Sequence, residues 1–114
     1  MKKFVDVLIP GNFYHIYNRA CGNEKIFIEE KNYDFFMDLF EERMMEYVEL
    51  YSYCLIPNHF HFLVKIKPAD EGSEEINYGR KFGNFFAAYA QSFNRLYNRK
   101  GNLFSQNFRR KLIR

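Results

Sequence analysis

The sequence predicts a two-layer α+β sandwich in which two helices cover one face of an antiparallel sheet. Its 114 residues suffice for one domain with a single core and are too few for a doubly wound sheet or an eight-fold barrel. Hydrophobic residues make up 47% and aromatic residues 20%, well above the content of a disordered segment. Strand-like and helix-like segments alternate in the order β-α-β-β-α-β. We therefore treat residues 1–114 as one domain.

The first strand is predicted over residues 12–17, where aromatic and β-prone residues precede turn formers at 18–23. A helix is predicted over residues 31–48, because apolar residues recur there at helical spacing and the glutamates fall mostly elsewhere on its surface. The spaced apolar residues are Phe36, Leu39, Phe40, Met44 and Tyr47.

Two further strands are predicted at residues 50–56 and 59–66. Pro57 and Asn58 separate them, and this pair of turn formers ends the first run. The two strands should therefore form a tight hairpin.

A loop over residues 67–75 leads into the clearest periodic segment, the helix at residues 82–97. Its apolar stripe, which we expect to be buried, consists of Phe82, Phe85, Phe86, Tyr89, Phe93, Leu96 and Tyr97. A turn at residues 98–102 precedes a last short strand at 103–110. This order is the split ferredoxin-like βαββαβ arrangement, which leaves one face of the sheet open.

Charge is distributed unevenly along the chain. Residues 1–79 hold 8 basic and 14 acidic residues, 8 − 14 = −6, whereas residues 80–114 hold 9 basic residues and no acidic one, a charge of +9. Such a basic segment favours a polyanionic partner, above all nucleic acid, although a solvated basic surface is the alternative. Polar and aromatic side chains that are interleaved with these charges, and that would contact bases, are Asn94, Tyr97, Phe104 and Phe108.

Localisation follows from two absences in the sequence. No apolar run approaches the roughly 18 residues that cross a bilayer, and the first six residues lack the apolar stretch of a secretory signal. We expect a cytoplasmic protein without membrane contact. Cys21 and Cys54 should then be reduced thiols, and Cys54, in an apolar strand, should be a small core residue.

The strand at residues 59–66 carries the most informative pattern. Side chains alternate along a strand, so Phe60 and Phe62 should lie under the helices while His59 and His61 project together from the open face. Their Cα atoms should be about 6 to 7 Å apart. Neutral imidazoles suit Mn²⁺, Zn²⁺ or Fe²⁺, and Mg²⁺ when phosphate oxygens complete the shell. The alternative is a pair of half-exposed histidines that are hydrogen-bonded to neighbours or water.

Residue chemistry alone supplies no attacking group. Neither cysteine is placed beside a base, and there is no Ser/His/Asp order. Tyr89 lies on the predicted buried stripe and Tyr97 at its end, so both are interpreted as core residues. The residues alone therefore indicate a histidine pair that could bind a metal, His59 and His61, and a basic segment at residues 80–114.

Three segments resemble one known family. They are the run 54–64 around Pro57-Asn58-His59-Phe60-His61, the run Tyr14-His15-Ile16-Tyr17-Asn18-Arg19, and, toward the C-terminus, Phe93-Asn94-Arg95, Gly101-Asn102-Leu103-Phe104 and Phe108-Arg109. Together they resemble the HUH-type single-strand tyrosine transposases, in particular the branch associated with repetitive extragenic palindromes (REP).

The resemblance implies a DNA transposase domain that binds single-stranded or hairpin DNA. It implies that His59 and His61 hold Mg²⁺ or Mn²⁺, which polarises the scissile phosphate, and that a tyrosine attacks it to form a 5′-phosphotyrosyl link that a second transfer reverses. It also implies a set of DNA-contacting residues: Asn18, Arg19, Asn94, Arg95, Arg109 and Arg110.

The sequence departs from the family pattern at the nucleophile. In that family the tyrosine lies on a helix after the last strand, in a Tyr-x-x-x-Asn-Pro context, and no such motif occurs here. The resemblance thus implies a nucleophile helix beyond Arg114, so no residue of this sequence is assigned as catalytic. A second chain covering the open face would make a homodimer. The alternatives are a non-catalytic nucleic-acid-binding module derived from such a transposase, and a structural remnant without nucleic-acid affinity.

Overall fold

The computed structural model describes residues 7–70, 75–105 and 107–114. Residues 1–6 and 71–74, which include the start of the chain and the centre of the predicted loop, lie outside the described residues. The elements, in chain order, are β1 (Phe13–Arg19), α1 (Glu30–Met44), β2 (Val48–Ile56), β3 (His59–Ile66), α2 (Tyr78–Leu96) and β4 (Arg109–Ile113). The predicted order is confirmed.

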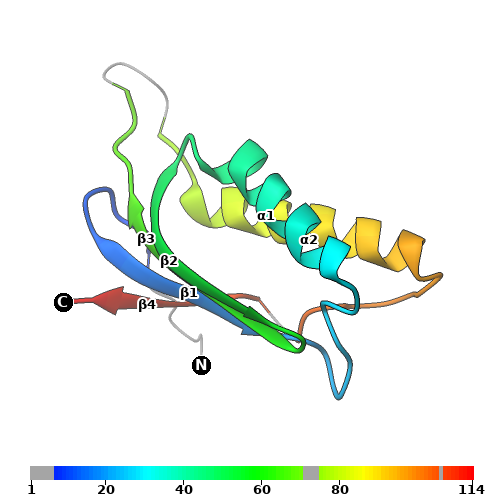
Figure 1. Cartoon of the computed structure of the whole chain (residues 1–114). Helices are drawn as coiled ribbons and strands as arrows, with labels where there is room; N and C mark the ends of the chain where they lie inside the picture. The colour runs from blue at the N-terminus through cyan, green and yellow to red at the C-terminus, as the bar shows by residue number, and fades with distance from the viewer. Residues whose placement is uncertain (1–6, 71–74, 106) are drawn as a thin grey trace, which may run out of the picture.

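The sheet has four strands in the order β2-β3-β1-β4, and every neighbouring pair is antiparallel. Both helices lie on the same face of this sheet, as Figure 1 shows, and they pack against each other. The fold is therefore the predicted two-layer α+β sandwich with a ferredoxin-like strand order. Within the described residues, no helix is long and apolar enough to span a membrane.

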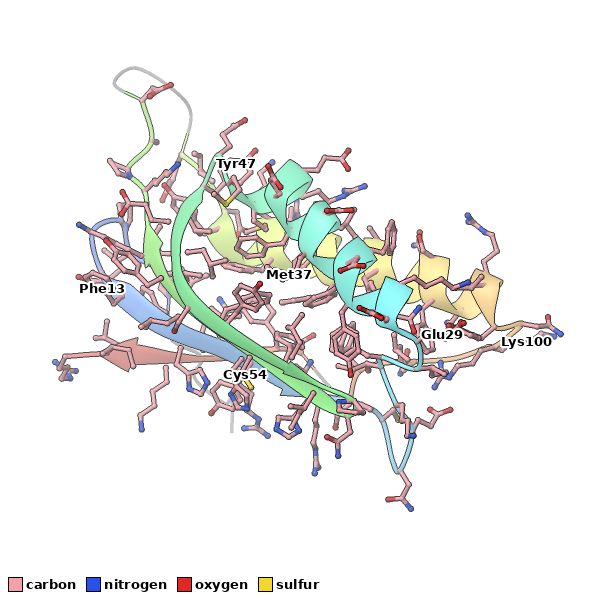
Figure 2. All side chains as sticks on the ribbon, in the orientation of Figure 1. Phe13, Glu29, Met37, Tyr47, Cys54 and Lys100 are labelled. Carbon is pink, nitrogen blue, oxygen red and sulfur yellow. The ribbon has the colours of Figure 1, made fainter. Side chains whose placement is uncertain are left out.

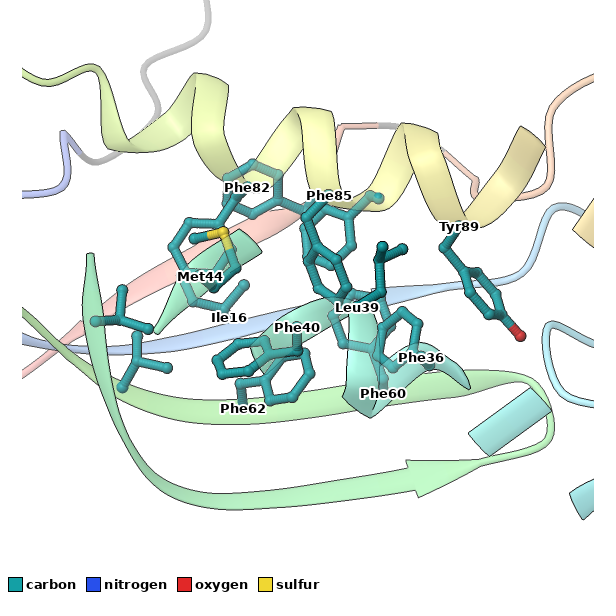
Figure 3. Close-up of a cluster of buried hydrophobic side chains, with 14 of the residues drawn as sticks. Ile16, Phe36, Leu39, Phe40, Met44, Phe60, Phe62, Phe82, Phe85 and Tyr89 are labelled. Atoms are coloured by element: carbon teal, nitrogen blue, oxygen red, sulfur yellow. The ribbon is translucent and has the colours of Figure 1, made fainter. Parts of the chain in front are cut away.

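Aromatic side chains fill the space between the helices and the sheet. Phe36 of α1 lies 5.4 Å from Phe60 and 5.8 Å from Phe62, measured between ring centroids, and 4.9 Å from Phe85 of α2. Figure 3 shows these rings between the two layers. Each buried aromatic side chain removes a large apolar area from water, so this cluster is the main source of the free energy of folding.

The two helices begin where their sequences provide caps. Asn32 and Glu29 form a reciprocal capping box at the start of α1, and the Asn77 side chain accepts a 3.0 Å hydrogen bond from the Arg80 backbone N–H at the start of α2. Helix α2 therefore begins four residues before the predicted 82. Its apolar stripe is buried as predicted except at its last two positions, where Leu96 is 53% exposed and Tyr97 is half-buried.

Two other boundaries differ from the prediction because strand pairing extends further than local patterns indicate. Helix α1 ends at Met44 and not at 48, because Val48 is fully buried and pairs with Ile66 as the first residue of β2. Strand β1 runs to Arg19 and not to Tyr17, because its last two residues pair with β3.

The last strand was predicted at 103–110, and this was wrong. Strand β4 begins only at Arg109, where pairing with Tyr17 of β1 starts. The preceding residues serve the core instead: Leu103 is 1% exposed and Phe108 6% exposed. The expectation that Phe108 contacts bases is also wrong, because its ring is buried and lies 5.5 Å from the Phe82 ring. The Phe104 ring, for which the same was expected, packs 5.8 Å from that of Phe60.

The prediction that Cys54 is a core residue was wrong, since its side chain is exposed. A bulge in β2 between Leu50 and Ser52 shifts the alternation of side chains, and Cys54 then pairs with His61. Paired residues of an antiparallel ladder point to the same face, so Cys54 lies on the open face. In Figure 2 its side chain is on the side of the sheet away from the helices.

Candidate nucleic-acid interface

Both histidines of the predicted pair line a cleft of about 370 Å³ at one end of the open face. This cleft also brings together residues from β1, from the β2–β3 turn and from the segment that enters β4. Its lining residues are Tyr17, Asn18, Arg19, Asn58, His59, His61, Ser105 and Arg109. Segments from both ends of the chain therefore contribute to one site.

Strand register positions these side chains. In the antiparallel pairing of β1 with β3, Tyr17 faces His61 and Arg19 faces His59, and β4 adds Arg109 on the other side of Tyr17. Because laterally paired residues share a face, all five side chains lie on the open face. The alternation along β3 is as predicted: His59 and His61 are half-buried, and Phe60 and Phe62 are buried under the helices.

Each histidine of the pair has a hydrogen-bond partner on its Nδ1 atom. His59 Nδ1 is 2.8 Å from Asn58 Oδ1, and His61 Nδ1 is 2.7 Å from His15 Nε2. An amide oxygen only accepts, so His59 Nδ1 donates, and in the neutral ring Nε2 then keeps its lone pair. The same holds for His61 when its Nδ1 donates to His15. This is the arrangement of metal-binding histidines, whose second nitrogen is held by an outer partner.

The electrostatics of the site favour a neutral imidazole at His61 and at His15. Burial lowers the pKa of His61, and the nearby His59 lowers it further. Burial likewise lowers the pKa of His15, with further contributions from His61 and from Lys111. Because a metal binds the neutral ring, the lowered pKa of His61 favours its ligand form at neutral pH.

The His59 and His61 rings lie 5.0 Å apart between centroids, with perpendicular planes. Within residues 7–70, 75–105 and 107–114, no group of three or more His, Cys, Asp or Glu side chains is placed to hold a metal ion. The pair thus fits a divalent ion as two nitrogen ligands, and phosphate oxygens and water would have to supply the rest of its shell.

His15 and Tyr17 are among the residues of the site that were not identified from the sequence, together with Asn58 and Ser105. The rings of His15 and Tyr17 stack with centroids 4.2 Å apart, and the Tyr17 ring lies 5.8 Å from that of His61. A signal for both was present: Tyr14 and Ile16 alternate with them, so the buried positions of β1 place His15 and Tyr17 on the face opposite the helices. The missing information was that β1 lies beside β3.

The predicted DNA-contacting residues separate into two groups. Arg19 and Arg109 are exposed and line the cleft. Asn18 also lines it, but the side chain is 9% exposed, its Oδ1 accepts the Arg19 backbone N–H, and its partner Phe60 lies on the helix-covered face.

The other three lie outside the cleft. Arg110 pairs with the buried Ile16, and its guanidinium carbon is 4.2 Å from the Phe108 ring centroid, so it faces the helix side. Asn94 donates to the Gly101 carbonyl and accepts from Arg99 Nη1. Arg95 is exposed in the last turn of α2.

Comparisons with known proteins give a structural neighbour. No protein-family model matches the sequence, and no curated protein matches it. Among solved structures, the chain is similar to a REP-associated tyrosine transposase bound to a REP hairpin, with a TM-score of 0.63 and 14% identity. The match covers 100% of this chain and 63% of that chain, so the sequence spans less than two thirds of its neighbour's length. At this identity the likeness establishes the fold.

Proposed function

We propose that this chain is a transposase-like DNA-binding domain whose partner is single-stranded or hairpin DNA. The observation that carries the proposal is the cleft in which His59 and His61 meet the exposed Arg19 and Arg109 on an uncovered sheet face. Cations at the rim of the cleft suit phosphate oxygens. The fold shared with a transposase that was solved on a REP hairpin supports the same partner.

The proposed cofactor is Mg²⁺ or Mn²⁺ on His59 and His61. When bound, it would polarise a phosphodiester and offset the charge that develops on its oxygens. The residues of the chain have supporting roles: Asn58 and His15 hold the ring orientation and tautomer of the two ligands, and Arg109 attracts the phosphate.

For the chemistry we propose strand cleavage and rejoining through a 5′-phosphotyrosyl intermediate, with the nucleophile on a helix that follows Arg114, as the family resemblance implies. Two tyrosines of α2 and its C-cap are engaged elsewhere. Tyr89 is buried and donates a 2.5 Å hydrogen bond to the Ile26 carbonyl, and burial raises its pKa. Tyr97 donates to Glu29, and burial raises its pKa as well. Raised pKa values oppose phenolate formation.

Metal binding tests the first part of the proposal. Mn²⁺ affinity, measured by titration calorimetry, should fall steeply in His59→Ala and in His61→Ala. In His15→Phe, which keeps a ring but loses the hydrogen bond to His61, we expect a loss of about tenfold, in the range for outer partners of ligands. Cys54→Ser is the matched control, since Cys54 pairs with His61 on the same face. Equal Mn²⁺ affinity in all four variants and in the unaltered chain would refute the assigned ligands.

Covalent capture tests the second part. The gene product extended past Arg114 should form a covalent adduct with single-stranded hairpin DNA in Mn²⁺, and His59→Ala should abolish it. Tyr17→Phe serves as the control because Tyr17 is the tyrosine that lines the cleft. An adduct that persists in His59→Ala, or that depends on Tyr17, contradicts the proposed mechanism.

The second candidate is a non-catalytic nucleic-acid-binding module. It is favoured by the two-ligand set, which is smaller than a complete metal centre. It predicts that His59→Ala leaves hairpin binding unchanged with or without Mn²⁺, whereas Arg109→Ala weakens it. Under the first proposal, added Mn²⁺ strengthens binding in the unaltered chain and not in His59→Ala.

A further inference from the structure

We propose that Tyr51 and Phe13, with Lys65 beside them, form a second DNA-binding point that stacks an unpaired base of a single strand lying across the open face. The inference rests on the proposed DNA partner and adds to it a place for the single-stranded part of the substrate. The three residues come from β2, β1 and β3, at the end of the face opposite the histidine cleft. In Figure 2, Phe13 and Cys54 mark the two ends.

The aromatic pair lies on the open face, where Tyr51 is exposed and Phe13 is half-buried. The Tyr51 and Phe13 rings lie 5.0 Å apart between centroids in an edge-to-face arrangement, and Tyr51 is 53% exposed. Lys65 Nζ lies 5.6 Å from the centroid of the Phe13 ring. Aromatic rings with an adjacent cation are the usual means of binding unpaired bases without regard to sequence.

The bulge in β2 accounts for the position of Tyr51. Leu50 pairs with Val64, which is buried under the helices, and Ser52 already pairs with Leu63 of the open face. Tyr51 is the extra residue between them, and the contact with Phe13 shows that its ring lies on the open face. Bulges often re-aim a side chain next to a functional site. The hydroxyl donates a 3.0 Å hydrogen bond to Glu49, which fixes the ring.

The charges on the open face favour a polyanion over a second copy of the chain as its binding partner. Strand register places four cations on the open face, and they are Arg19, Lys65, Arg109 and Lys111. The described carboxylate that the register places there is Glu49, opposite Lys65. Two copies that met face to face would bring like charges together, whereas a DNA strand would neutralise them.

The distance along the face suits a short single strand. His61 and Lys65 are four residues apart on β3, which corresponds to about 13 Å. Stacked nucleotides advance by about 3.4 Å each. A strand whose phosphate occupies the cleft would therefore reach Tyr51 within about four nucleotides.

The experiment compares two tyrosines of the same strand. Tyr51 and Tyr53 are 53% and 54% exposed, but Tyr53 pairs with Phe62 and so belongs to the helix-covered side. The probes are a DNA hairpin with an eight-thymidine single-stranded tail and the same hairpin without the tail, both fluorescently labelled. We expect Tyr51→Ala to weaken binding of the tailed hairpin about tenfold, while Tyr53→Ala changes it less than twofold. Tyr51→Phe should retain binding.

The outcomes separate this inference from the proposed function. Tailed-hairpin binding that is equal in Tyr51→Ala and Tyr53→Ala overturns the stacking site and leaves the proposed function standing. Failure of the unaltered chain to bind either hairpin overturns both. If light scattering shows a dimer that Tyr51→Ala dissociates, the face binds a second copy, and the inference is wrong.

Discussion

The two faces of β3 share one backbone but differ in burial and in side-chain chemistry. The face toward the helices consists of Phe60, Phe62, Val64 and Ile66, all at most 1% exposed, whereas His59, His61, Leu63 and Lys65 on the other face are half-buried. On the covered face, packing dictates each side chain. The open face is free of that demand and holds ionisable and ligand-forming groups. The difference teaches that core residues and residues of the candidate site are separated by a single residue step along one strand.

The largest expected effect is a loss of stability from a substitution on the helix-covered face of β3. Phe60→Ala should lower the free energy of unfolding by about 3–5 kcal/mol, because it leaves a cavity among packed rings. His61→Ala, one residue away, should cost about 1 kcal/mol or less, since the ring is half-buried and loses one hydrogen bond. Urea denaturation followed by circular dichroism measures both.

A loss of stability that is larger in His61→Ala than in Phe60→Ala would contradict the division between the faces. If His61→Ala destabilised the protein as much as Phe60→Ala, the open-face imidazole would be part of the packing. Because total stabilities are only about 5–15 kcal/mol, Phe60→Ala is best measured at low temperature, and Phe60→Leu supplies a milder variant of the same test.

A second prediction uses two adjacent arginines that the pleat directs to opposite faces. Arg109→Ala should weaken hairpin binding and reduce the salt dependence of log K by about 0.7 to 0.9 for one lost phosphate contact. Arg110→Ala should leave that slope unchanged and instead lower stability by about 0.5 to 1 kcal/mol, because its guanidinium lies over the Phe108 ring.

Fluorescence anisotropy at several salt concentrations gives the slope, and thermal denaturation gives the stability. The family resemblance alone treats both arginines as DNA contacts, so equal slopes for the two variants would favour that simpler view over the division by face.

Local patterns in the sequence predicted what depends on one strand or one helix. The alternation of β3 correctly assigned both histidines to the open face, and the stripe of α2 correctly assigned Tyr89 to the core. The split ferredoxin-like order followed from the sequence of elements. These features depend on the periodicity of apolar residues, which can be read directly from the sequence.

Features that depend on long-range pairing were missed. His15 contacts a residue 46 positions away, and only the β1–β3 register brings them together. Cys54 was assigned to the core because a bulge is invisible in a short apolar run. Strand β4 was placed too early because Leu103 and Phe108 are apolar, and nothing local distinguishes a core-filling segment from a strand.

The smallest expected effect concerns a region that belongs to neither face. Glu24, in the loop after β1, forms an ion pair with Arg99, and Arg99 Nη2 also donates a 2.9 Å hydrogen bond to the Asn102 carbonyl. The hydrogen bond from Arg99 lowers the pKa of the Glu24 carboxyl below its usual 4.5. Arg99, one of the nine cations of residues 80–114, thus joins two loops and is not free for a polyanion.

The pKa shift fixes the sign of the pH dependence. A carboxyl whose pKa is lower in the folded state stabilises the fold above its unfolded pKa, and this contribution disappears as the pH falls through the folded value. Glu24→Gln should therefore lower the melting temperature slightly at pH 7 and not at all once the pH is well below 4.5. The control is Glu42→Gln on the exposed surface of α1. A larger loss at low pH than at pH 7 would mean that the Glu24–Arg99 pair does not stabilise the two loops.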